Sequence, residues 1–173
     1  MNSKQIITII ACLLAFVATA GAQDLDTKYA TSLIKPGEQA PEFALNDMEG
    51  KSHKLSDLKG SYVVLDFWAS WCPDCRKDIP EMKRLHEKYG KKVRFVGISG
   101  DDKRANWEKC VKDNQMNWLH LSELKKWKET NIRALYQVQW IPSLYLLDGE
   151  GRVVLATVMV DKLAAKLEEV AGR

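Results

Sequence analysis

The feature that most constrains the fold is a short segment, residues 62–67 (YVVLDF), which is almost entirely apolar and has Asp66 as its one charged residue. Its β-branched and aromatic residues favour a strand, and an apolar run without alternation predicts a strand that is buried on both faces. Such a strand needs helices on both sides of its sheet. We predict a helix over residues 73–89, which stops at Gly90, and a second central strand over 93–99.

The rest of the chain alternates strands and helices and ends in a hairpin and a helix. Short strands at 43–45 and 51–53 are predicted to form an N-terminal hairpin. A turn or one helical turn is expected at 56–60, and a short helix or ordered tail at 24–35. Further strands are predicted at 118–121, 143–147 and 152–157, and further helices at 101–114, 127–136 and 161–170. This order predicts one α/β domain with a central mixed sheet flanked by helices.

The first 22 residues are predicted to be a secretory signal peptide. Lys4 precedes an apolar run at 6–17, and small residues suited to cleavage follow it at 18–22. The run is shorter than the roughly 20 residues that a membrane-spanning helix needs. A membrane anchor that is not cleaved is the alternative to a signal peptide. Cys12 lies inside it, where lipidation is a second alternative. The predicted organisation is a signal peptide at 1–22, an N-terminal segment at 23–34 and a domain at 35–173, exported and soluble, with the periplasm as the expected location.

Composition narrows the classes of function. The chain is 46% hydrophobic and 28% charged, as globular proteins are. Its net charge of +3 is too small for a nucleic-acid-binding footprint. Four cysteines in 173 residues are too few for a scaffold held together by disulfides, so the question becomes which of them do chemistry.

Cys72 and Cys75 form a Cys-Pro-Asp-Cys motif where the buried strand meets the following helix. Free N–H groups and the helix dipole favour an anion at a helix N-terminus, so Cys72 is expected to react as a thiolate. Cys75 follows one turn later, within reach of a disulfide. We predict a redox pair in which Cys72 attacks a substrate disulfide and Cys75, lying deeper, releases the reduced product. Half of a zinc site is the alternative, but no second pair of ligands is spaced to complete it.

Two carboxylates are predicted to assist this pair. Asp66 lies in the buried strand, where desolvation raises a carboxyl pKa and suits it to accept a proton near neutral pH. Asp78 follows Cys75 by one turn on an apolar helix stripe and is expected to be partly buried beneath it. The alternatives are that Asp66 is a structural buried acid and that Asp78 is solvated and complements the helix dipole.

Residues 66–75 (DFWASWCPDC), followed by Pro80, resemble the thioredoxin active site. The segment 36–43 and the extra segment around 107–118 resemble the TlpA/ResA branch, which comprises exported thiol–disulfide reductases related to the AhpC/TSA group. The resemblance implies a thioredoxin-like fold with an N-terminal β-hairpin and an inserted helix. It also implies that Cys72 is the attacking thiol, Cys75 the resolving thiol and Asp66 the buried acid, while Asp78 stands where ResA-type proteins have a glutamate.

Ile141-Pro142 and the strand after it resemble the cis-proline loop of thioredoxin. The resemblance implies that Pro142 faces the disulfide and that Ile141 offers backbone hydrogen bonds to a substrate; an ordinary strand-initiating proline is the alternative. Trp140 stands where the family often has glycine, and it is expected to border and narrow the substrate groove or to serve as surface cover. The residues predicted to bind substrate are Trp71, Pro73, Asp74, Trp140, Ile141 and Pro142.

The function implied is an exported thiol–disulfide oxidoreductase that uses neither a cofactor nor a metal. Asp74 places a negative charge in the redox loop, which disfavours the Cys72 thiolate and favours a reductant; a solvated, screened Asp74 is the alternative. Cys110 is expected to be a buried, inert cysteine, with a third redox thiol or an intermolecular disulfide as the alternative. The implied partners are disulfide-containing exported proteins, apocytochrome c among them, and a membrane thiol–disulfide electron donor. A peroxiredoxin-type peroxidase, despite Ala69 in place of a threonine, and a copper-binding chaperone are the other candidates.

Overall fold

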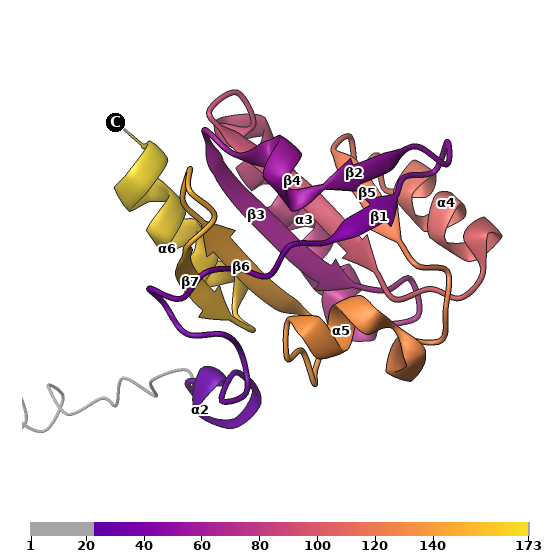
Figure 1. The fold of residues 1–173 in the computed structure, drawn as a ribbon, viewed down its shortest axis with the longest axis horizontal. Coiled ribbons are helices and arrows are strands. Elements are labelled where there is room, and N and C mark those ends of the chain that lie inside the picture. The colour runs from indigo at the N-terminus through magenta and orange to yellow at the C-terminus, as the bar shows by residue number, and fades with distance from the viewer. Residues whose placement is uncertain (1–22, 173) are drawn as a thin grey trace, which may run out of the picture.

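The computed structural model describes residues 23–172, so the predicted signal peptide and Cys12 lie outside the described residues. Seven strands form one mixed sheet in the order β2-β1-β5-β4-β3-β6-β7, and the helices pack on both of its faces (Figure 1). The strands are β1 (Ala44–Asn46), β2 (Ser52–Lys54), β3 (Tyr62–Trp68), β4 (Val93–Ser99), β5 (Leu119–Ser122), β6 (Ser143–Leu147) and β7 (Val153–Thr157). The helices are α2 (Asp26–Tyr29), η1 (Leu55–Leu58), α3 (Pro73–Tyr89), α4 (Arg104–Asp113), η2 (Trp127–Glu129), α5 (Asn131–Leu135) and α6 (Val160–Ala171).

The apolar strand β3 occupies the middle of the sheet, parallel to β4 and antiparallel to β6. Because side chains alternate along a strand, Leu65 and Phe67 pack into the core beneath α5 and the N-terminal segment, while Val64 packs into the core beneath α3 and α6. Asp66 shares the face of Val64, so its carboxyl group points toward the α3 side of the sheet. The predicted α/β architecture with an N-terminal hairpin and an inserted helix, α4, is confirmed.

Two predicted helices are wrong in extent. The helix expected at 127–136 is interrupted at Thr130, whose backbone is extended and which separates the short helices η2 and α5. The helix expected from residue 101 begins at Arg104, because the buried carboxylate of Asp101 is bonded to the loop before Cys72. In contrast, α3, β4 and β6 have the predicted bounds, as their signals are local to each segment.

The N-terminal segment packs along the edge of the sheet that β7 forms. After α2, the backbone pairs with β7 through the bridge between Gln39 and Arg152 and through bonds of Gly37 and Glu38 to Val153. This path lays α2 beside the C-terminal end of β7, where Asp26 bonds to Thr157 (Figure 1). Within residues 23–172, no helix is long and apolar enough to span a membrane.

Candidate active site

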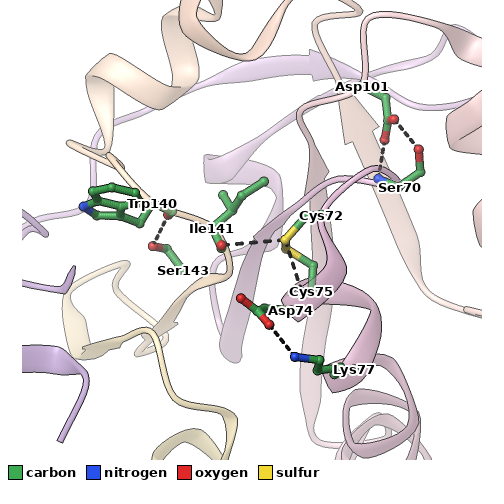
Figure 2. The surroundings of a disulfide bond; sticks show 9 residues. All are labelled: Ser70, Cys72, Asp74, Cys75, Lys77, Asp101, Trp140, Ile141 and Ser143. Carbon is green, nitrogen blue, oxygen red and sulfur yellow. Dashed lines mark hydrogen bonds and ion pairs between the residues drawn. A yellow bond between two sulfur atoms is a disulfide. The ribbon is translucent and has the colours of Figure 1, made fainter.

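The redox pair lies at the first turn of α3, immediately after the central strand. Cys72 is the N-cap residue of the helix, Pro73 is the first helical residue, and the backbone N–H of Cys75 donates to Cys72 Sγ at 3.1 Å. Proline is suited to this position because the first helical N–H has no partner within the helix. Cys72 and Cys75 are joined as a disulfide, with their Cα atoms 5.3 Å apart (Figure 2). The sulfur of Cys72 is therefore the one that receives a helix N–H.

Burial does not distinguish the two cysteines. Cys72 and Cys75 are each 4% exposed, so the expectation that Cys75 lies deeper is not reflected in the residue exposures. The neighbouring Trp71 is 52% exposed and Pro73 is also exposed, so the surface around the pair is open although the sulfur atoms are packed. The distinction between an attacking and a resolving thiol depends on the N-cap position of Cys72.

Asp66 is buried in the sheet beside the redox helix. It is 6% exposed, and its backbone is in register with Gly97 on β4 and Leu144 on β6. Burial, and secondly the charge of Asp78, raises its pKa to about 7. A carboxyl group with that pKa exchanges its proton readily at neutral pH, which is the property expected of it from the sequence.

Asp78 is half-buried on α3 and opens onto a surface groove. Burial raises its pKa to about 6, and the charges of Asp74 and Asp161 add to this effect, while Lys77 opposes it. The charge of Asp78 in turn raises the pKa of Asp66. Asp78 is the more exposed of the two acids and the one that lines the groove.

The loop before β6 faces the disulfide. The peptide bond between Ile141 and Pro142 is cis, as the resemblance implied, and the carbonyl oxygen of Ile141 lies 3.6 Å from Cys72 Sγ (Figure 2). The hydroxyl of Ser143 donates a hydrogen bond to the carbonyl of Trp140 at 2.7 Å, which stabilises the loop. The Trp140 side chain is 55% exposed and packs edge-to-face on Tyr29, with ring centroids 5.2 Å apart.

A groove of about 600 Å³ runs from this loop across α3 to the N-terminal segment. Its lining includes the predicted residues Asp74, Asp78, Trp140, Ile141 and Pro142. It also includes residues that sequence reasoning missed, namely Leu25, Tyr29, Lys77, Val158, Met159, Val160 and Asp161. No local signal marks these residues, because they come from three separate segments that meet only in the folded chain.

Asp74 is paired and solvated. Its carboxylate accepts a hydrogen bond from Lys77 Nζ at 2.8 Å, and its side chain is 71% exposed (Figure 2). A neighbouring cation and the surrounding water both weaken the effect of this charge on Cys72. The geometry matches the alternative of a screened Asp74, so the direction of the reaction has to be argued from other groups.

A buried carboxylate that sequence reasoning missed holds the loop before the redox pair. Asp101 is 1% exposed and accepts bonds from the N–H of Ser70 at 2.9 Å and from its hydroxyl at 2.5 Å (Figure 2). The hydroxyl of Ser99 also donates to it at 2.7 Å. The available signal was an acidic residue just after the C-terminal end of a central strand, the edge where sites of α/β proteins gather.

Cys110 is half-buried rather than fully buried, which corrects the expectation from the sequence. It is a free thiol at the edge of the apolar cluster that contains the redox pair, because the helix turns it partly toward solvent. Burial raises its pKa, which disfavours the reactive thiolate. Within the described chain, no group of three or more His, Cys, Asp or Glu side chains is arranged to hold a metal ion.

Comparison with known proteins finds thiol–disulfide oxidoreductases among the chains that are similar to this one. The AhpC/TSA family profile matches residues 36–156. The thiol-disulfide oxidoreductase ResA of Bacillus cereus (strain ZK / E33L) is 35% identical over 119 residues, which cover 68% of this chain and 66% of that protein. A thiol-disulfide oxidoreductase from Bacteroides fragilis NCTC 9343 is similar with a TM-score of 0.72 at 28% identity, covering 77% of this chain and 99% of that one. A Chlorobium tepidum protein assigned as thiol:disulfide interchange protein DsbE has a TM-score of 0.69 at 34% identity, covering 80% and 97%.

Proposed function

The chain belongs to the AhpC/TSA family, and we propose that it is an exported reductase of protein disulfides that works through Cys72 and Cys75. Its relatives and structural neighbours support the class of enzyme, a thioredoxin-like thiol–disulfide oxidoreductase of the ResA/DsbE type. The observation that carries the proposal is the Cys72–Cys75 disulfide at the N-terminus of α3, with a helix N–H on Cys72 Sγ.

The proposed cycle begins with both cysteines reduced. The thiolate of Cys72 attacks one sulfur of the substrate disulfide, whose S–S bond breaks as a mixed disulfide forms, and the departing substrate thiolate takes a proton. The thiolate of Cys75 then attacks Cys72 Sγ and releases the second substrate thiol. Two electrons pass to the substrate, and the protein is left with the disulfide seen in the structure. A thiol donor restores the pair by the reverse exchange.

The second step needs a base for Cys75. We assign this role to Asp66, whose pKa of about 7 allows it to take a proton from a thiol and return it within one cycle. Asp78, half-buried at the groove, passes the proton between Asp66 and solvent. Both side chains take part only in proton transfer, and neither forms a bond with the substrate.

The carboxylates of Asp66 and Asp78 support the reducing direction. Stabilising the thiolate makes a redox pair a stronger oxidant, whereas nearby carboxylates disfavour the thiolate and make the pair a stronger reductant. Asp66 and Asp78 lie on the α3 side of the sheet and supply that charge when ionised, while Asp74 is compensated by Lys77.

Export and the partners belong to the same proposal. The N-terminal pattern of residues 1–22 is that of a secretory signal, and a reductase exported to an oxidising compartment needs a thiol donor delivered through the membrane. Its substrates are then disulfide-containing exported proteins. Apocytochrome c is the specific candidate, because the family resemblance implies it.

The reduction potential of the Cys72–Cys75 pair tests the direction. We expect a value near that of thioredoxin, about −270 mV, whereas a value near −120 mV would mark an oxidant and overturn the assignment. Equilibration with defined glutathione ratios gives the value, and a Cys75→Ala variant identifies substrates by trapping the mixed disulfide on Cys72.

Catalytic consumption of hydrogen peroxide by the purified protein would instead favour the peroxidase, and copper retained after dialysis would favour the copper chaperone.

A further inference from the structure

The groove beside the disulfide has an apolar wall that the N-terminal segment supplies. Leu25 and Tyr29 of this segment face the groove, where Tyr29 packs on Trp140. Leu25 and Trp140 are both exposed, so both present apolar surface to solvent within one concave site. The groove reaches the redox pair through Ile141, whose carbonyl oxygen lies 3.6 Å from Cys72 Sγ.

This wall is fastened by a set of buried and charged contacts. The carboxylate of Asp26 accepts hydrogen bonds from the hydroxyl of Thr157 at 2.8 Å, the N–H of Val158 at 2.8 Å and Lys162 Nζ at 2.7 Å. Lys162 Nζ also donates to Asp24 at 2.7 Å. Thr157 is completely buried, which makes the contact with Asp26 part of the folded core. A four-residue helix would not hold its place unaided, so these contacts maintain the wall.

The groove also has an acidic part. Asp74, Asp78 and Asp161 line it, and their charges act on one another, since both Asp74 and Asp161 raise the pKa of Asp78. Lys77 is the lining cation, and it is bonded to Asp74. Among residues 23–172, neither Asp78 nor Asp161 has an ion-pair partner within 4.0 Å. An incoming cation would meet two carboxylates without a direct ion pair, although Lys77 acts on Asp78 from a greater distance.

We propose that this groove selects the substrate, and that its occupant is an extended polypeptide segment with an apolar side chain and a lysine or arginine close to the reacting cysteine. The apolar side chain packs between Leu25, Tyr29 and Trp140, and the cation lies toward Asp78 and Asp161. The first contact removes apolar surface from water, and the second pairs opposite charges next to the disulfide. This inference rests on the proposed function, since it names the substrate class of that same redox site.

Four synthetic peptides test the preference on the purified, reduced protein. They share one cysteine blocked as a 2-thiopyridyl disulfide and differ only beside it, with leucine or serine at one position and lysine or glutamate at the next. Attack by Cys72 breaks the peptide disulfide and releases thiopyridone, which is followed by absorbance. We expect the leucine–lysine peptide to react about tenfold faster than the serine–glutamate peptide, since partial burial of one leucine and one exposed ion pair contribute roughly that much.

Matched variants assign the preference to the groove. Leu25→Ser removes the preference for leucine over serine, whereas Leu135→Ser leaves it unchanged, because Leu135 is 43% exposed but lines a different hollow. Asp161→Asn reduces the preference for lysine over glutamate, and Asp113→Asn, on the exposed end of α4, does not. Raising the salt concentration has the same effect as Asp161→Asn on the wild-type protein, because it screens the charges.

Two different failures are distinguishable. Dipyridyl disulfide, which is uncharged and has no peptide to bind, reports on the redox pair alone. If the protein consumes dipyridyl disulfide but reacts equally fast with all four peptides, the groove does not select and the inference is wrong, while the proposed function stands. If neither dipyridyl disulfide nor any peptide is consumed, the proposed function fails and the inference fails with it.

Discussion

Replacing Asp66 by asparagine should stabilise the oxidised protein at neutral and alkaline pH. Asp66 is 6% exposed, and burial is the main reason that its pKa is raised from 3.8 to about 7. Ionising this group inside the sheet therefore costs free energy that the unfolded chain does not have to supply. Asparagine has nearly the same shape and never ionises, so the variant avoids this cost.

The size and sign of the effect follow from linkage. Below about pH 4 the folded and unfolded states both keep the Asp66 proton, and the group has no effect on stability. Between about pH 4 and pH 7 the unfolded chain loses this proton while the folded protein keeps it, so wild-type stability falls as the pH rises. A shift of roughly three units at 1.36 kcal/mol each gives about 4 kcal/mol, reached above pH 7.

Urea unfolding of the oxidised wild-type and Asp66→Asn proteins, measured at a series of pH values from 4 to 8, is the suitable assay. We expect the difference in the free energy of unfolding to be smallest at the acidic end and to grow with pH, with unchanged m-values. Asp113→Asn, an exposed change that also removes one carboxylate, serves as the control and should show no such growth. A difference between Asp66→Asn and wild type that stays constant across this range would refute the reasoning.

Three further predictions concern the surroundings of the pair. Asp78→Asn should lower the pKa of Asp66, because the charge of Asp78 helps to raise it, and NMR titration of the Asp66 carboxyl carbon will show the shift. Asp101→Ala should lower the free energy of unfolding by about 1–3 kcal/mol, since it leaves the Ser70 N–H without its buried partner; denaturant unfolding measures this, and Asp102→Asn is the exposed control. Gly97→Ala should also destabilise by about 1–3 kcal/mol, because a Cβ there would lie 2.4 Å from His120 Nδ1 and 2.9 Å from Trp68 Nε1. Unfolding of Gly97→Ala beside Gly149→Ala, where the nearest atom is 3.5 Å away, isolates this steric effect.

The elements with strong local signals were predictable in full. Helix α3 has a proline at its first position and a glycine directly after its last residue, and both signals act within the segment itself. Strand β4 is an apolar run between turn residues, which limits its extent in the same way. Thr130 shows where this reasoning fails, because periodicity indicated one helix over residues 127–136 and the extended backbone of Thr130 divides it.

Local sequence was enough to predict the redox pair, its place at the start of α3 and the buried acid of the central strand, because each depends on neighbours a few residues away. The surroundings of that pair depend on contacts between distant segments. The carbonyl of Ile141 lies 69 positions from Cys72, the carboxylate of Asp101 lies 31 positions from Ser70, and Asp26 meets Thr157 across 131 positions. These contacts form through the order of strands in the sheet and the path of the chain along its edge, which no short pattern records. The chemistry of the site is therefore local, whereas the groove that we propose to select its substrate is a product of the fold.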